Sequence, residues 1–318
     1  MPVAGLRCTL VVLLTSMTVP ASAQSRRPAC AIDMGSNSFR RIVATFENGR
    51  YAQARVEVRT LGVGDDVARN SGRIGEAKIG EIVATLTTFR SACENDQAAP
   101  IKAVGTAAFR QAANGQDVVA AARKLGIDLE IASERRESEL AYLVGSLGRD
   151  GYAVVDNGSR SIELVSRAGG ALRHLVLNLG YRTAWETFFA SATDPAAAVL
   201  AFQKELRQHS TKAGFMKGMQ TLVGVEFAEM ADGLFGKAPA EGRVFKLQEL
   251  EAKLSSITTS STDAFQALKK SKDIDRSLPR LVVALTVMKD FGYSELRLTE
   301  RELGAGLIIE AGLARSAK

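Results

Sequence analysis

Two short loops rich in glycine and serine carry backbone and side-chain groups that could bind phosphate. The first begins at Asp33 and reads Asp-Met-Gly-Ser-Asn-Ser; the second begins at Asp156 and reads Asp-Asn-Gly-Ser-Arg-Ser. Successive backbone N–H groups in such a loop form a concave nest for phosphate oxygens, and the hydroxyl groups add donors. Either loop alone could be an ordinary polar turn. The phosphate-binding candidates are Gly35, Ser36, Asn37 and Ser38 in the first loop and Gly158, Ser159, Arg160 and Ser161 in the second.

The aspartates at the start of the loops predict a bound cation. A carboxylate repels phosphate, so neither Asp33 nor Asp156 is expected to contact it directly, but each can bind a divalent cation or its water. Two such loops facing each other across a cleft would grip a phosphate chain from both sides. The net charge of +6, from 41 Lys and Arg against 35 Asp and Glu, is a mild basic bias that is compatible with an anionic ligand.

Composition excludes several other kinds of protein. A chain of 318 residues with 46% hydrophobic residues can bury one or two sizeable cores, so it is not a disordered tail. Three cysteines are too few for a disulfide scaffold, and two histidines are too few for a His-based metal cluster.

The same order of elements surrounds both loops. Around the first loop, strands are predicted at residues 30–33, 39–46 and 51–60, with a hairpin turn at Asn48-Gly49. Around the second, strands are predicted at residues 152–155, 162–166 and 172–177, with a turn at Gly169-Gly170. Because the two loops match in sequence and lie in the same order of strands, the chain is expected to contain an internal duplication. We therefore expect two related domains that face each other.

The remaining segments alternate between helical and strand patterns. Helices are predicted at residues 76–93, 116–125, 195–209, 248–257, 261–268, 279–291 and 306–314, and further strands at residues 101–104, 127–132 and 296–298. Residues 237–243 are expected to form a loop. The order of elements in the first half predicts a mixed sheet with helices on its faces.

The N-terminal segment has the layout of a secretory signal. Arg7 provides a short positive region, Leu10–Leu14 an apolar centre too short to span a bilayer, and Ala21–Ala23 a small-residue cleavage site. We expect residues 1–23 to be removed, so that a soluble mature chain beginning near Gln24 is exported to the periplasm. A buried N-terminal helix is the alternative.

Two cysteines, Cys30 and Cys93, remain in the mature chain. Cys30 opens the first predicted strand and Cys93 closes the first predicted helix. In an oxidising compartment they could pair, whereas two unpaired buried thiols are the alternative that the residues leave open.

Two further segments hold charged residues that could bind phosphate or take part in its transfer. Residues 104–110 end a buried strand in small residues and Arg110, which is suited to bidentate phosphate contact. A solvated arginine at the start of a helix is the alternative. Residues 133–139, Ser-Glu-Arg-Arg-Glu-Ser-Glu, form a charge run that is otherwise typical of a solvated helix face with Ser133 as its cap.

Several of these motifs resemble those of the exopolyphosphatase/guanosine-pentaphosphate phosphohydrolase (Ppx/GppA) family. Residues 31–40 resemble the family's first phosphate motif, and residues 152–165 resemble its second. Residues 106–114 resemble its Thr-x-Ala-x-Arg-x-Ala-x-Asn motif, and residues 131–142 resemble the segment with its catalytic glutamate. Glu137 stands at the place of the catalytic glutamate. The resemblance covers roughly residues 29–310 and is most specific at the first motif.

The resemblance implies a fold and a division into domains. The fold would be α/β, with two actin-like (ribonuclease H-like) domains that contain mixed five-stranded sheets flanked by helices, and a cleft between them. Residues 24–132 would form the first domain and residues 133–305 the second, and the C-terminal helix, residues 306–318, would pack back on the first. In this fold Cys30 and Cys93 would lie on adjacent elements at the sheet end opposite the phosphate loops, which favours a disulfide.

The resemblance also implies an activity. The chain would be an exported hydrolase that releases terminal phosphate from inorganic polyphosphate, or a related phosphate-rich small molecule, with Mg²⁺ or another divalent cation. Thr106 would join the two loops in holding phosphates. Arg110 would neutralise developing charge, and Glu137 would orient or deprotonate the attacking water. The cation ligands would be Asp33, Asp156 and Glu163.

Departures from the family pattern keep a second interpretation open. Ser159 and Arg160 stand where the family has glycines, and Glu226-Phe227 occupies part of its Gly-Gly-Thr motif. The alternative is a catalytically weak protein that binds polyphosphate or a nucleotide in the same cleft. An actin-like ATP kinase is disfavoured, because the segment at residues 224–227 does not supply a glycine-rich adenosine loop. No nucleic-acid or membrane partner is implied; a homodimer, the substrate chain length and a preference for guanosine pentaphosphate are left open.

Overall fold

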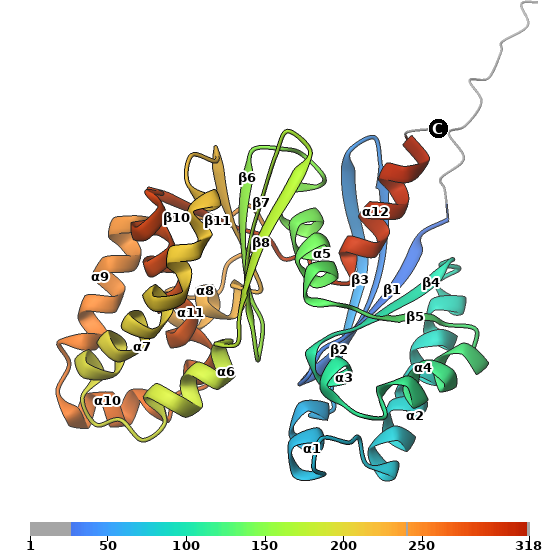
Figure 1. The fold of residues 1–318 in the computed structure, drawn as a ribbon, viewed down its shortest axis with the longest axis horizontal. Coiled ribbons are helices and arrows are strands. Elements are labelled where there is room, and N and C mark those ends of the chain that lie inside the picture. Colours follow the sequence, from blue (N-terminus) through green and yellow to red (C-terminus); the bar gives the residue numbers. More distant parts are fainter. Residues whose placement is uncertain (1–26, 240, 317–318) are drawn as a thin grey trace, which may run out of the picture.

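Two mixed sheets with helices on their faces form the two halves of the molecule (Figure 1). The structure, a computed structural model, describes residues 27–239 and 241–316. The expected signal sequence, residues 1–23, lies outside the described residues. Within the described ranges, no helix combines the length and the apolar character needed to cross a membrane.

The first sheet has five strands in the order β3-β2-β1-β4-β5. Their bounds are β1 Ala29–Met34, β2 Ser38–Glu47, β3 Arg50–Thr60, β4 Ile101–Gly105 and β5 Asp128–Ile131. The first three strands pair antiparallel, and β4 pairs parallel with both β1 and β5, so the expected mixed sheet is confirmed. Asn48 and Gly49 have φ values of 51° and 72°, the left-handed conformation that a tight hairpin turn requires at both positions.

The second sheet repeats this arrangement and adds a strand. It contains six strands in the order β10-β11-β9-β6-β7-β8, so the expectation of five strands is wrong here. The bounds are β6 Tyr152–Asn157, β7 Ile162–Ala168, β8 Ala171–Leu177, β9 Thr221–Val225, β10 Val244–Lys246 and β11 Glu295–Leu298. The extra strand, β10, has three residues, which is too short for an alternating pattern to be visible in the sequence.

Helices cover the outer faces of both sheets (Figure 1). The first half carries α1 Val63–Arg69, α2 Glu76–Asn95, α3 Ala107–Gln111 and α4 Gly115–Lys124. The second carries α6 Tyr181–Ala184, the π-helical turn η1 Trp185–Phe189, α7 Pro195–Ser210, the 3-10 turn η2 Thr211–Met216, α8 Ala228–Phe235, α9 Leu247–Thr258, α10 Thr262–Lys269 and α11 Ile274–Phe291. Helix α11 begins at Ile274, earlier than the start at Pro279 that the sequence predicted. Ile274 and Leu278 are already buried in the core.

Two helices, α5 (Glu134–Ser146) and α12 (Ala305–Ser316), lie between the sheets. The first packs against β6 and β7, and the second packs against β1, β2 and α5. A Cβ atom on Gly306 would come within 3.0 Å of Leu140, and one on Gly312 would overlap Phe46. These glycines therefore allow α12 to lie close to both α5 and β2.

The cysteines of the first half form the expected disulfide. Cys30 in β1 and Cys93 in α2 are bonded, with their Cα atoms 6.0 Å apart, and both side chains are buried. Cys30 lies at the start of β1, whereas Asp33 lies near the end of the strand that leads into the first loop. The bond thus anchors α2 to the end of the sheet that is remote from the loop.

We predict that losing this bond destabilises the chain. The two cysteines are separated by 63 residues, and cross-linking a loop of this length removes about 4 kcal/mol of unfolded-state entropy at most. Urea denaturation of a Cys30→Ala, Cys93→Ala double variant should show a loss of up to that size. Reductant should lower the stability of the wild type to a similar level and leave the double variant unchanged. Equal stabilities of wild type and variant under oxidising conditions would contradict the prediction.

Candidate active site

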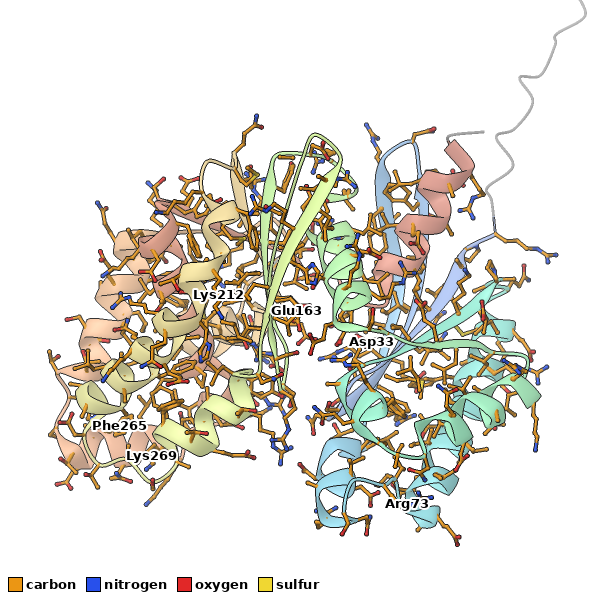
Figure 2. All side chains as sticks on the ribbon, in the orientation of Figure 1. Asp33, Arg73, Glu163, Lys212, Phe265 and Lys269 are labelled. Carbon is orange, nitrogen blue, oxygen red and sulfur yellow. A yellow bond between two sulfur atoms is a disulfide. The ribbon has the colours of Figure 1, made fainter. Side chains whose placement is uncertain are left out.

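Both loops open onto one cavity of about 260 Å³ between the two halves. Of the site residues predicted from the sequence, all except Arg110 line it. Figure 2 shows Asp33 and Glu163 in the middle of the molecule, on the two sides of the space between the sheets. Residues that the sequence interpretation did not assign to the site also line the cavity: Arg40, Val58, Thr60, Ala107, Tyr181, Glu226, Glu229, Arg276, Arg280, Glu302 and Leu303.

Backbone hydrogen bonds fix the first loop. The Gly35 N–H donates to Ser38 O over 3.1 Å, which turns the chain from β1 into β2. Asn37 O accepts hydrogen bonds from the N–H groups of Leu61 and Gly62, both over 2.9 Å. The segment that follows β3 therefore braces the loop, and Ser36, Asn37 and Ser38 face the cavity.

The start of α6 braces the second loop from behind. A Cβ atom on Gly180 would come within 2.5 Å of backbone atoms of Gly158, Arg160 and Ser161, so only glycine allows this approach. The N–H groups of Tyr181 and Arg182 donate to Gly158 O and Ser159 O over 3.0 and 3.1 Å. The loop thus keeps a defined shape, although serine and arginine replace two glycines of the family pattern.

The guanidinium of Arg160 ties the second loop to the first half of the molecule. It lies 3.2 Å from Asp65 of α1 and 3.3 Å from Glu186 of η1. Arg182 contacts the same two carboxylates, Asp65 over 2.8 Å and Glu186 over 3.0 Å. Arg160 therefore lines the cavity with a guanidinium that is already paired across the two halves.

Glu137 projects into the cavity from the first turn of α5. Ser133 begins this helix, and its hydroxyl oxygen accepts the Arg136 N–H over 3.2 Å, so the expected cap is confirmed. Arg110 donates one hydrogen bond to Glu137 Oε2 and another to Ala132 O over 2.7 Å. Burial raises the pKa of Glu137, although Arg110 partly offsets the shift. Arg110 is thus behind Glu137 and holds it, rather than lining the cavity itself.

Asp156 and Glu163 form a cross-strand pair on the second sheet. They are directly opposite each other on β6 and β7, with exposed fractions of 5% and 4%. Burial and then the charge of Glu137 raise the pKa of Glu163 to about 8. Burial, Glu226 and Glu163 raise the pKa of Asp156 well above its usual range. Among the described residues, Asp156 Oδ1 and Glu163 Oε1 have no hydrogen-bond partner, which suits oxygen ligands of a divalent cation.

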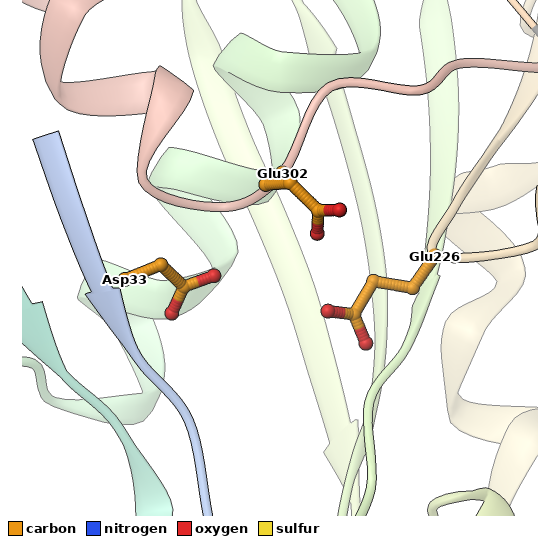
Figure 3. A group of neighbouring side chains, drawn as sticks. All are labelled: Asp33, Glu226 and Glu302. Atoms are coloured by element: carbon orange, nitrogen blue, oxygen red, sulfur yellow. The ribbon is translucent and has the colours of Figure 1, made fainter. Parts of the chain in front are cut away.

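A second group of carboxylates joins Asp33. Figure 3 shows the side chains of Asp33, Glu226 and Glu302 converging on one point, and a carboxylate oxygen of each lies within 4.8 Å of the others. The guanidinium of Arg40 lies 3.3 Å from Glu226 and 3.1 Å from Glu302. Burial raises the pKa of Asp33 to about 8 and that of Glu302 to about 7, in spite of Arg40.

Arg280 closes the end of the cavity beside the second loop. It is 1% exposed and donates to Glu229 over 2.6 Å and to Asn157 O over 3.2 Å. Its guanidinium also lies over the ring of Tyr181, 4.2 Å from the centroid. This aromatic face is therefore already covered by a cation and does not offer a free stacking surface for a base.

Acidic groups dominate the lining of the cavity. Among the residues that the structure describes, seven carboxyl groups and four guanidinium groups line it. When these carboxyl groups are ionised, a phosphate chain would meet net negative charge there unless cations were bound with it. The geometry therefore fits a site for phosphate that works together with metal ions.

The paired sheets and the cavity between two phosphate-type loops define a two-domain α/β protein with the actin-like ATPase fold. The chain is similar to a Ppx/GppA family member from Aquifex aeolicus, with 22% identity, a TM-score of 0.76, and coverage of 91% of this chain and 98% of the other. It is also similar to an exopolyphosphatase from Cytophaga hutchinsonii, with 18% identity, a TM-score of 0.72, and coverage of 91% and 98%.

The chain belongs to the Ppx/GppA phosphatase family, whose sequence profile matches residues 52–313. The resemblance stated from the sequence motifs and the actin-like fold expected from it are confirmed. The profile match begins within β3, so the first phosphate-type loop lies outside the matched residues.

The buried carboxyl groups predict an unusual pH dependence. Asp33 and Glu163 have raised pKa values of about 8 in the folded chain, against 3.8 and 4.5 when free. The folded state therefore binds more protons than the unfolded state between these limits, so the free energy of unfolding falls as pH rises through them. Metal-free protein should unfold at lower urea concentration at pH 8 than at pH 5.

Removing one buried carboxyl group should flatten this profile. Glu163→Gln abolishes its titration, so the variant should lose less stability than the wild type between pH 5 and pH 8. Glu134→Gln, which removes an exposed charge from α5, should keep the wild-type slope. Stability that rises over the same range in the metal-free wild type would contradict the raised pKa values.

Proposed function

We propose that the chain hydrolyses phosphoanhydride bonds and releases terminal phosphate from inorganic polyphosphate or a related phosphate-rich substrate. The observation that carries this proposal is the place of Glu137, a buried carboxylate held by Arg110 in the cavity that both phosphate-type loops line. Family membership supports the reaction class, since the family is one of phosphatases.

The loops would bind the substrate. The backbone N–H groups and hydroxyls of residues 35–38 and 158–161 would hold phosphate oxygens from both sides of the cavity. The buried, unpartnered oxygens of Asp156 and Glu163 fit Mg²⁺ or another divalent cation, and Asp33 faces the same cavity. When bound, the cation would neutralise phosphate charge that the acidic lining otherwise repels.

Glu137 would act on the attacking water. Arg110 holds Oε2, which leaves Oε1 to accept a proton from the water. The water oxygen forms a bond to the terminal phosphorus as the bridging P–O bond breaks, and the shortened chain leaves with the bonding electrons. Arg110 would keep the carboxylate in place and add positive charge near the reacting phosphate.

Replacing Glu137 should separate catalysis from binding. Glu137→Gln keeps the shape of the side chain but removes the base, so turnover should fall about 100- to 10,000-fold. Affinity for polyphosphate should stay unchanged or rise slightly, because one negative charge leaves the cavity. Phosphate release from long-chain polyphosphate, with and without Mg²⁺, measures the first effect, and equilibrium binding measures the second. Glu134→Gln, one turn earlier on the same helix, is the matched control and should behave as wild type.

A catalytically weak binding protein is the second candidate. The observation that favours it is the pairing of Arg160 with Asp65 and Glu186, since this loop residue holds the two halves together instead of reaching phosphate. Under this alternative, wild type and Glu137→Gln would both bind polyphosphate and would release phosphate equally slowly. That result would overturn the hydrolase proposal and support the binding protein.

We propose, further, that the chain is exported. The proposal rests on the signal-like layout of residues 1–23 and on the Cys30–Cys93 disulfide, a bond typical of oxidising compartments. Intact-mass analysis of protein recovered from the periplasm should give a chain that begins near Gln24. Ala23→Arg, which disrupts the small-residue cleavage site, should leave the segment attached. Wild-type chains found only in the cytoplasm and starting at Met1 would contradict export.

A further inference from the structure

We infer that Asp65, Arg160, Arg182 and Glu186 form a clasp between the two halves beside the cavity, and that a phosphate chain replaces Asp65 as a partner of Arg160 when it binds. Asp65 is thus an internal competitor of the ligand. The inference rests on the part of the proposed function that places a phosphate chain in the cavity, and it does not depend on hydrolysis.

Two arginines share two carboxylates in the clasp. Asp65 lies 3.2 Å from Arg160 and 2.8 Å from Arg182, and Glu186 lies 3.3 Å and 3.0 Å from the same two guanidiniums. Asp65 belongs to α1 of the first half, whereas the other three belong to the second half, in the loop after β6, in α6 and in η1. Within the clasp, the contacts of Asp65 therefore cross between the halves and those of Glu186 do not.

The clasp joins the two phosphate-type loops. The Gly64 N–H donates to Ser36 O over 2.8 Å, and a Cβ atom on Gly64 would come within 3.1 Å of Ser36 Cβ. The start of α1 is therefore packed directly against the first loop, and Asp65 is the next residue. Arg160 belongs to the second loop and lines the cavity. The ion pair between Asp65 and Arg160 thus restrains the spacing of the loops that would hold phosphate.

The clasp lies away from the points where the chain passes between the halves. The chain passes from the first sheet to the second through α5 and returns through the segment between β11 and α12. Figure 1 shows α1 and α6 toward the end of the molecule that is remote from α12. A rotation of the halves about the two crossings would therefore separate the members of the clasp.

The ion pairs of the clasp are weak enough to exchange. The side chains of Asp65 and Arg160 are 27% and 29% exposed, and those of Arg182 and Glu186 are 33% and 49% exposed. Ion pairs with this exposure contribute little in water and are screened by salt. A released Asp65 would stay in contact with water, so opening the clasp does not leave a buried charge without a partner.

A phosphate group can take the place of Asp65 on Arg160. A guanidinium binds phosphate through two charge-assisted hydrogen bonds, and each unit of a phosphate chain offers such an acceptor. Ser159 also lines the cavity, and its buried hydroxyl oxygen has no hydrogen-bond partner among the described residues. A phosphate at this loop would accept hydrogen bonds from both residues, whereas Asp65 contacts the arginine alone.

Distances between the halves test the clasp without any activity. Spin labels on Ala68→Cys in α1 and Thr187→Cys in η1, both exposed positions, report the separation by pulsed electron paramagnetic resonance. The native cysteines of the described residues are bonded to each other and take no label. Without ligand, Asp65→Asn should lengthen or broaden the distance, as should salt at about 1 M, which shortens the Debye length to about 3 Å. Glu186→Gln should keep the wild-type distance, because it removes no contact between the halves.

Affinity for inorganic tripolyphosphate tests the exchange, measured in the Glu137→Gln background so that the ligand is not consumed. Asp65→Asn should bind about 5- to 25-fold more tightly, the effect of one or two exposed ion pairs that otherwise hold the free state. Glu186→Gln is the matched control: it removes an equal charge from the same arginines and should change the affinity less. Arg160→Gln should weaken binding more in the Asp65→Asn background than with Asp65 present, where loss of the clasp offsets the lost phosphate contact.

The outcomes distinguish the clasp from the proposed function. An Asp65→Asn chain with the wild-type distance, or with the affinity of Glu186→Gln, would overturn the clasp even if the wild type releases phosphate from polyphosphate. So would an Arg160→Gln change that leaves binding unaltered in the Asp65→Asn background, because Arg160 would then be only a tether. The expected shifts in a chain that releases no phosphate would keep the clasp and overturn the hydrolase. Circular dichroism checks that each variant, changed at a partly exposed position, is folded.

Discussion

The crowding of carboxylates between the two sheets is the constraint on which the rest of the site depends. Asp33, Asp156 and Glu163 are buried from solvent, and burial together with neighbouring carboxylates raises the pKa of each. Such a group is tolerated in a folded protein only when protons, guanidiniums or metal ions neutralise it. Arg40 and Arg280 supply part of that charge. When ionised, the remaining carboxylates would repel anionic ligands that enter without cations.

The duplicated strand order explains why the two phosphate-type loops meet. In each half a strand ends in the aspartate loop, pairs antiparallel with the next strand and pairs parallel with a later one. The two loops therefore lie at equivalent ends of the central strands β1 and β6, and α5 and α12 lie between the two sheets. Glu137 of α5 and Arg110 of α3 are not part of this duplicated strand order. In the proposed hydrolysis, this pair would define the side from which the water attacks.

Local patterns were enough to predict the loops and most strands, because alternation, turn residues and loop composition are properties of consecutive residues. The disulfide was favoured only by the fold that the family resemblance implied. The cluster around Asp33 was not predictable in this way. Arg40 looks like any polar residue of an alternating strand until pairing places it opposite Asp33. Glu302 lies in a short segment without periodicity, and Glu226 was noted only as a departure from a family motif. Their contacts depend on how three distant segments pack, which no single window of sequence contains.

The return of the C-terminal helix to the first sheet has a consequence for the order in which the chain can fold. Ile42 and Phe46 of β2 are buried in one cluster with Leu307, Ile308 and Ile309 of α12. A chain that emerges from the ribosome, or from a translocation pore, completes the strands long before it supplies this cover. The part of the inner face that α12 covers therefore stays exposed until this helix is synthesised, and exposed apolar surface of this kind favours aggregation during folding.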